Sequence, residues 1–136
     1  VRVKLPSSWR RRAKILHRDV AGEYGLLALL KSHVPEDVAQ RAAAGWNGDQ
    51  MLTLRFGTAG PISILLETHW DSAADAKEFY DAYADFVKRR VPTSTAATVH
   101  GVMRFPLPGG RSIEIELKRQ RVRVAENLPS NVSLRR

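Results

Sequence analysis

The chain has 136 residues, of which 43% are hydrophobic, and it carries a formal net charge of +8. This length suits one domain that buries its own core. The absence of cysteine excludes a disulfide framework and a thiolate metal site, and no apolar run approaches the length of a membrane span. Because the chain begins at Val1 without an initiator methionine or a signal peptide, we expect a trimmed or processed piece of a longer protein.

Residues 1–18 are predicted to form a basic extended arm or linker. They contain seven basic residues and no acid, Pro6 removes a backbone donor, and apolar periodicity is poor. A basic end of this kind can contact anionic lipid, nucleic acid or an acidic protein surface. A solvated, flexible terminus is the simpler interpretation and the one we favour. Nucleic acid is the least expected partner, because Trp9 is the single aromatic residue in the two basic ends of the chain.

Two short helices are predicted next. From about Arg18 to Lys31, apolar residues recur at helical spacing and indicate a helix with a broad apolar face. The residues of this face are Val20, Tyr24, Leu26, Leu27 and Leu30. Pro35 suits a first helical position, and the alanine-rich segment after it predicts a second helix that ends at Gly45. The two helices are expected to form an αα-hairpin.

The centre of the chain predicts a β-hairpin followed by a long amphipathic helix. Alternation of Leu52, Leu54 and Phe56 indicates a half-buried strand, and a turn at residues 58–61 leads into a buried strand at 62–70. One face of the second strand carries Ile62, Ile64, Leu66, Thr68 and Trp70. Asp71 or Ser72 then caps a helix over residues 73–90, whose apolar residues recur at helical spacing.

Three further strands are predicted, at residues 98–105, 112–118 and 121–125. The last two have one apolar and one charged face, as in a sheet that is wetted on one side. Residues 127–136 are predicted to be a tail, and residues 118–136 again have excess positive charge, with six basic residues and one acid. We therefore predict a single α+β domain over residues 19–126. It has an αα-hairpin, an antiparallel sheet of about five strands, and one long amphipathic helix packed on one face, in the order α-α-β-β-α-β-β-β.

No recognisable catalytic or cofactor-binding motif occurs in the sequence, so we predict neither an enzyme nor a cofactor. The four histidines include no HExxH arrangement and no pair at helical spacing. A metal cluster of Glu67, His69 and Asp71 is geometrically feasible, but a row of polar residues on a wetted sheet face explains them without a ligand. An acid–base site of Glu23, Asp49 and Asp71 is also disfavoured, because carboxylates beside turns and helix starts usually serve as caps.

Two stretches resist a purely local explanation. The segment around Glu23 has two glycines inside a predicted helix, which costs about 1 kcal/mol for each relative to alanine and suggests close approach of another backbone. In residues 45–49, Trp46 lies between two glycines and is followed by Asp49. We interpret Trp46 as closing one end of the core and Asp49 as accepting turn amides, in preference to a binding loop.

These stretches, with a third that begins at Trp70, resemble the C-terminal domain of a bacterial and archaeal family of HExxH, gluzincin-like zinc metallopeptidases. The matching residues are Gly22, Glu23, Gly45, Trp46, Gly48, Asp49, Trp70 and Asp71. Asn47 and Gln50 depart from the family pattern, and the zinc-binding helix is absent from this chain. The resemblance therefore implies an accessory domain in the cell envelope, in a periplasmic or other extracytoplasmic compartment, that binds no metal itself.

Two functions compete on this basis. The first is a non-catalytic accessory or interaction domain of an envelope-associated metallopeptidase-like protein, whose partner is an upstream domain of the same precursor or another protein subunit. The alternative is a stand-alone small basic subunit that docks through its basic ends onto a larger, membrane-bound assembly or an anionic membrane surface. The residues expected to make such contacts are Arg10, Arg11, Arg12, Lys14, Arg135 and Arg136.

Overall fold

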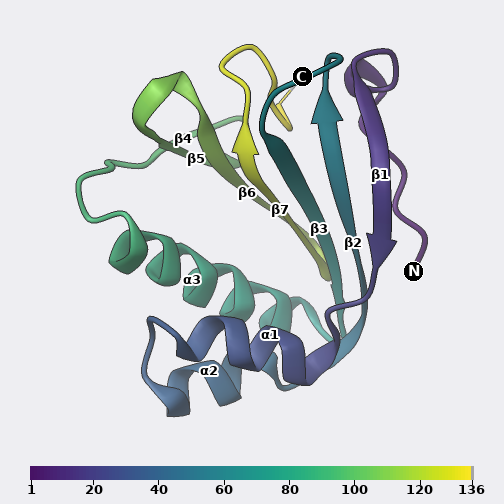
Figure 1. Cartoon of the computed structure of the whole chain (residues 1–136). Helices are drawn as coiled ribbons and strands as arrows, with labels where there is room; N and C mark the ends of the chain where they lie inside the picture. The colour runs from purple at the N-terminus through teal and green to yellow at the C-terminus, as the bar shows by residue number, and fades with distance from the viewer. Residues whose placement is uncertain (136) are drawn as a thin grey trace.

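In the computed structural model, which describes residues 1–135, helices cover one face of an antiparallel sheet (Figure 1). The strands are β1 (Ala13–Asp19), β2 (Trp46–Phe56), β3 (Ile62–Trp70), β4 (Ala97–Val99), β5 (Val102–Pro106), β6 (Ser112–Lys118) and β7 (Arg121–Leu128). The helices are α1 (Gly22–Lys31), α2 (Glu36–Ala43) and α3 (Ala73–Arg90), with short 3-10 turns η1 (Ser7–Trp9) and η2 (Pro108–Gly110). Among the described residues, no helix combines the length and the apolar character needed to cross a bilayer.

The sheet has the strand order β1-β2-β3-β7-β6-β5-β4, and each neighbouring pair is antiparallel. The predicted α+β class is confirmed, as are the αα-hairpin, the β2–β3 hairpin and the long helix α3. The predicted element order is wrong. The described chain runs β-α-α-β-β-α-β-β-β-β, with seven strands in the sheet where roughly five were predicted.

The first missed strand is β1, which lies inside the predicted arm. It forms one edge of the sheet and pairs with β2. The register shifts between Ile15 and His17, so Leu16 has no paired residue, and the side chains of β1 are exposed or half-buried. An edge strand that contains a bulge lacks the strict alternation by which a strand is recognised in sequence.

The second missed strand arises because residues 97–106 form a hairpin and not one continuous strand. β4 and β5 are joined by His100 and Gly101, whose φ angles are 52° and 76°. Positive φ at both central residues is the pattern of a two-residue type I′ turn. Because the first of these residues is a histidine, glycine content alone does not reveal the turn.

Helix α3 packs on the sheet through a stripe of aromatic residues. Trp70 at the end of β3 stacks on Phe79, with ring centroids 4.7 Å apart, and both side chains are buried. Of the two predicted caps, Ser72 is the one observed, because its Oγ accepts the backbone amide of Asp75 at 3.0 Å. The predicted end of this helix at Arg90 is also observed.

Helix α1 contributes less apolar surface than predicted. Leu26 and Leu30 are buried against the helical core, whereas Val20 is 57% exposed and Tyr24 is 85% exposed. The reason is that α1 begins at Gly22, after Val20, and its buried stripe follows the two leucines, which are one helical turn apart.

The face of the sheet away from the helices, here called the second face, is covered by the two ends of the chain. Its core consists of Val3, Trp9, Leu52, Leu54, Leu65, Val102, Ala125, Leu128, Val132 and Leu134. The N-terminal and C-terminal segments each supply two of these buried residues. The favoured interpretation of the chain ends as solvated, flexible termini is therefore wrong, and so is the prediction of a sheet that is wetted on one side.

Hydrogen bonds fix both ends of the chain on the second face. The Trp9 indole Nε1 donates to the carbonyl oxygen of Ser133 at 2.9 Å. The Leu134 amide donates to the carboxylate of Glu114 at 2.6 Å, and this fully buried carboxylate also pairs with Arg104 at 2.8 Å. A buried carboxylate is stable when it is paired and hydrogen-bonded, so Glu114 anchors the C-terminal segment to β6.

Candidate anion-binding groove

Polar side chains continue the second face beyond its apolar core. Along β3, the residues on this side change from Ser63 and Leu65 to Glu67 and His69, because alternate residues of a strand point to the same side. The strand register aligns the polar residues in two rows. One row is Gln50, Glu67, Arg123 and Glu116, and the next is His69, Arg121 and Lys118.

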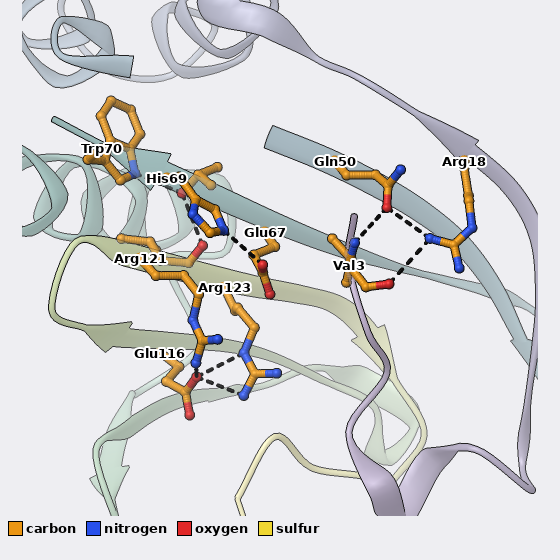
Figure 2. Close-up of polar contacts among 11 residues, drawn as sticks. Val3, Arg18, Gln50, Glu67, His69, Trp70, Glu116, Arg121 and Arg123 are labelled. Atoms are coloured by element: carbon orange, nitrogen blue, oxygen red, sulfur yellow. Dashed lines mark hydrogen bonds and ion pairs between the residues drawn. The ribbon is translucent and has the colours of Figure 1, made fainter. Parts of the chain in front are cut away.

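Glu116 and Arg123 form a fixed ion pair in the first row (Figure 2). Arg123 Nε donates to Glu116 Oε1 at 2.9 Å, and Arg123 Nη2 lies 2.8 Å from the same oxygen. Arg121 lies farther away, with its Nη2 3.7 Å from the same oxygen. One carboxylate thus lies beside two guanidinium groups, but only Arg123 holds it by a hydrogen bond.

His69 and Glu67 contact each other on β3. His69 Nε2 lies 2.9 Å from Glu67 Oε2, and 10% of the Glu67 side chain is exposed. The metal cluster considered from sequence also required Asp71, which follows the end of β3 and is exposed. Within residues 1–135, no three histidine, cysteine or carboxylate side chains are grouped to hold a metal ion.

Gln50 and Arg18 clamp the N-terminal segment across the second face (Figure 2). Gln50 Oε1 accepts the Val3 amide at 2.8 Å and Arg18 Nη1 at 2.8 Å. The same Arg18 nitrogen donates to the Val3 carbonyl at 3.3 Å. Because Val3 is buried in the second core, this clamp fixes the backbone that carries the neighbouring Lys4.

A groove of about 550 Å³ lies between the polar rows and the two folded ends of the chain. One carboxylate, that of Glu116, lines it, together with the exposed imidazole of His100. The cations that line it are Lys4, Arg10, Lys118, Arg121, Arg123 and Arg135. With the imidazole neutral, the formal charge of the groove is +5.

The fold itself does not neutralise this charge. In the part of the chain that the structure describes, no carboxylate forms an ion pair with Lys4, Arg10, Lys118 or Arg135. Lys118 also lies directly opposite Arg121 in the β6–β7 register. Like charges directly opposite each other across two strands destabilise a sheet, and a concave surface of one sign attracts counter-ions.

A second hollow, of about 370 Å³, adjoins the groove at Lys118 and Arg121, which line both. Arg119 lines this second hollow from the tip of the β6–β7 hairpin, and His69 lines it from β3. The basic surface therefore extends past the groove around the end of this hairpin.

The chemistry of these side chains is that of anion binding. Arginine and lysine are charged at neutral pH and present hydrogen-bond donors without acceptors. A guanidinium group matches the spacing of two oxygens of a carboxylate or phosphate. The groove is thus equipped to hold an anion by charge and by donated hydrogen bonds.

Several of the motif residues recognised in the sequence meet at the start of α1. Asp49 is 2% exposed, and its two oxygens accept the amides of Ala21 and Gly22 at 2.8 Å each. Trp46 Nε1 also donates to Asp49, at 2.9 Å. Asp49 therefore accepts amides from the N-terminal end of a helix, where a carboxylate is favoured, and not from its own turn. Both of its oxygens are occupied in this way.

Gly45, Trp70 and Asp71 lie at the adjoining start of α3. Gly45 has a φ of 82°, and a Cβ atom there would lie 2.5 Å from Asp75 Oδ2. The Gly45 carbonyl accepts the Asp71 amide at 2.8 Å. Trp70 lies opposite Trp46 in the β2–β3 register. These residues join the start of β2, the end of β3 and the start of α3. Position 45 requires glycine both for its φ angle and for its lack of a side chain.

Glu23 is exposed in the first turn of α1. The close backbone approach predicted at the glycines beside it is not observed. A Cβ atom at Gly22 would meet nothing within 4 Å, and one at Gly25 would meet only the Ala21 Cβ, at 3.5 Å. Gly22 and Gly48 instead serve positive φ angles, of 76° and 116°.

The basic residues predicted to contact a partner do not all lie in one place. Arg10 and Arg135 line the groove, and Arg136 lies outside the described residues. Arg11 and Arg12 line a different hollow, and Lys14 is exposed on the edge strand β1. The folded ends thus direct two of these predicted cations into one site.

Four groove cations were not predicted: Lys4 of the N-terminal segment and three residues of the β6–β7 hairpin, namely Lys118, Arg121 and Arg123. The sequence signal of the three hairpin residues is the segment KRQRVR, in which two arginines alternate along one side of β7. The two chain ends that complete the site are remote from β7 or separated from it by a turn, so the sequence alone does not bring them together.

The fold and the groove define an α+β domain with one antiparallel sheet, which has helices on one face and a basic groove on the second face. Residues 11–136 match the model of a family described as a domain of unknown function, DUF8575, and the chain belongs to this family. No curated protein matches the chain.

One similar solved structure is the extracellular domain of PknH from Mycobacterium tuberculosis. The TM-score is 0.59, and the alignment covers 95% of this chain and 84% of that chain at 8% sequence identity. At this identity the similarity concerns the fold alone. Neither the description of the family nor that of the PknH domain mentions a metallopeptidase.

Proposed function

We propose that this chain is a non-catalytic interaction domain that binds an anionic partner in the basic groove. The observation that carries the proposal is the convergence of six cations and one carboxylate on one hollow of about 550 Å³. Cations from both ends of the chain take part in it, which explains why the excess positive charge lies at the two ends of the sequence. The stability cost of opposed like charges supports a binding role over a purely structural one.

We further propose that the domain works in the cell envelope, as an accessory part of a larger protein. Two observations support this location. The sequence motifs resemble the C-terminal domain of an envelope-associated metallopeptidase-like family, and the fold is shared with a domain described as extracellular. In this proposal the chemistry belongs to an upstream domain or to another subunit, and the present chain supplies recognition.

The proposal is tested by retention on a sulfated-polysaccharide column. A groove variant with Lys118→Ser and Arg121→Ser should elute at a lower salt concentration than the parent chain, because it removes two groove cations. A control with Arg41→Ser and Lys77→Ser loses the same charge from α2 and α3, on the helical side. Equal elution of the groove variant and the control would show that net charge, and not the groove, governs binding.

The alternative function is a stand-alone basic subunit that docks onto an acidic protein. It is favoured by the exposure of Arg11 and Lys14, which lie outside the groove and remain open to a larger partner. This alternative predicts a protein that copurifies with the chain from its source at low salt and separates at high salt. Loss of that partner in an Arg11→Ser/Lys14→Ser variant, with column retention unchanged, would favour docking over groove binding.

A further inference from the structure

We propose that the groove binds a phosphate group that carries at least two negative charges, with Arg121 as its principal ligand-binding side chain. This inference rests on the proposed function, since it assigns the chemistry of the anion held in the groove. It is carried by the hydrogen-bonding state of Arg121, by the separate segments that supply the other cations, and by the opposition of Lys118 and Arg121.

The guanidinium fork of Arg121 is open on the groove side of β7. Its Nη2 lies 3.7 Å from Glu116 Oε1, which exceeds hydrogen-bonding distance, and 32% of its side chain is exposed. Among residues 1–135, no acceptor takes a hydrogen bond from its guanidinium group. Arg123, in contrast, donates a hydrogen bond to Glu116 from Nε, has its Nη2 2.8 Å from the same oxygen, and is 14% exposed. Glu116 therefore occupies Arg123 and leaves the fork of Arg121 for an external anion.

The remaining cations reach the groove from three separate segments. Lys4 and Arg10 belong to the N-terminal segment, Arg135 to the C-terminal segment, and Lys118 to β6. A carboxylate has one charge and two oxygens in one plane. A phosphate monoester has three terminal oxygens in different directions and about two charges at neutral pH. Donors that come from several directions therefore suit phosphate better than carboxylate.

The β6–β7 hairpin gains most from such a ligand. Lys118 and Arg121 are directly opposite each other, and a dianion between them converts a repulsion into two attractions. A ligand that binds the folded chain in this way must also stabilise it against unfolding.

A nucleobase is not the recognised part of the ligand. The described lining of the groove contains no tryptophan, tyrosine or phenylalanine, and stacking on such rings is how single-stranded bases are commonly held. The groove therefore recognises its ligand through the phosphate group. Two sources present this group alike, namely a soluble polyphosphate and the headgroup of a phosphomonoester lipid.

The test is calorimetric titration of the full chain with sodium tripolyphosphate at about 0.15 M salt. We expect saturable binding to one site, weakened about tenfold or more by Arg121→Gln, because one charge-assisted contact is lost. The matched control Arg41→Gln, at an exposed side chain of α2, should leave the affinity unchanged within about twofold. Citrate, a tricarboxylate, should bind at least about tenfold more weakly than tripolyphosphate.

The lipid source is tested with vesicles of phosphatidylcholine, with and without phosphatidic acid. Binding to tripolyphosphate, to phosphatidic acid vesicles or to both, with loss in Arg121→Gln, supports the proposal and identifies the source. Binding to neither, equal binding of citrate, or no effect of Arg121→Gln overturns it. If the groove variant nevertheless elutes early from the sulfated column, the anion-binding function stands and only the phosphate assignment falls.

Discussion

Trp9 Nε1 donates a hydrogen bond of 2.9 Å to the carbonyl oxygen of Ser133, and so joins the N-terminal segment to the C-terminal one on the second face of the sheet. Trp9 is 1% exposed and packs edge-on against Phe56, with ring centroids 5.4 Å apart. The ends of the chain are thus structural parts of the domain, and the groove they help to build depends on their packing.

Replacing Trp9 by alanine is expected to lower the free energy of unfolding by about 3 to 5 kcal/mol, because a large buried side chain leaves a cavity. Trp9→Phe keeps most of the packing and should cost only about 1 to 2 kcal/mol, mainly for the lost hydrogen bond. Urea denaturation measures both values. A loss below about 0.5 kcal/mol for Trp9→Ala would mean that the N-terminal segment is not part of the folded core.

Asp49→Ala should destabilise the domain by about 3 kcal/mol, since three partly buried donors around α1 lose a buried charged acceptor. The matched control is Asp37→Ala on α2, whose side chain is 70% exposed and pairs only with Arg41. That change should remain within about 0.5 kcal/mol. Thermal unfolding of the two variants compares them directly, and equal losses would argue against a capping role for Asp49.

Gly45→Ala should be more harmful than Gly57→Ala, although both residues have a positive φ, of 82° and 86°. The shared backbone strain costs about 1 kcal/mol in each case. At Gly45 the new Cβ would also lie 2.5 Å from Asp75 Oδ2, whereas at Gly57 it would meet nothing within 4 Å. We expect the additional cost at Gly45 to be about 1 to 3 kcal/mol by urea denaturation. Identical midpoints for the two variants would contradict this clash.

The pH dependence of stability should report on Tyr83. Its hydroxyl donates to Glu126 Oε2 at 2.5 Å, and burial, followed by the charge of Glu126, raises the pKa of Tyr83 well above its usual value of 10.0. The folded chain therefore favours the neutral phenol. Its contribution to stability is complete below the unfolded pKa of about 10 and is lost as the pH rises from there through the folded pKa.

The comparison variant is Tyr83→Phe, which cannot ionise. At neutral pH it should be less stable than the parent by about 1 to 2 kcal/mol, because a charge-assisted hydrogen bond is lost. The difference should shrink as the pH rises above about 10, because ionisation of Tyr83 then stabilises the unfolded state of the parent chain, whereas the variant has no such group. Urea denaturation at about pH 8 and about pH 11 gives this difference. A constant or growing difference would show that the sign is wrong.

Glu116→Gln should lower stability and strengthen the response to phosphate. The variant leaves Arg121 and Arg123 without their shared carboxylate, which should cost about 1 to 3 kcal/mol. Tripolyphosphate should then raise the melting temperature of Glu116→Gln by more than that of the parent chain. Glu78→Gln, an exposed change of equal charge on α3, is the control. A smaller phosphate response in Glu116→Gln than in this control would contradict the assigned role of Glu116.

The sequence by itself determined the α+β class, the αα-hairpin, the β2–β3 hairpin and the helix from Ala73 to Arg90. These elements are local, and their signals lie within one segment each. Apolar residues at periods of 2 or 3.6, a serine cap, and turn residues at the ends are sufficient to specify them. Edge strand β1 was not predicted, because its bulge breaks the two-residue alternation of side chains.

The tertiary structure alone decided where the two basic ends lie and which cations share a site. Lys4, Arg121 and Arg135 are brought together because apolar residues on both ends are buried against the sheet. That burial depends on contacts between residues more than a hundred positions apart, such as Trp9 and Ser133. Local periodicity carries no information about such contacts, since the same charged residues on a solvated arm would have the same sequence pattern.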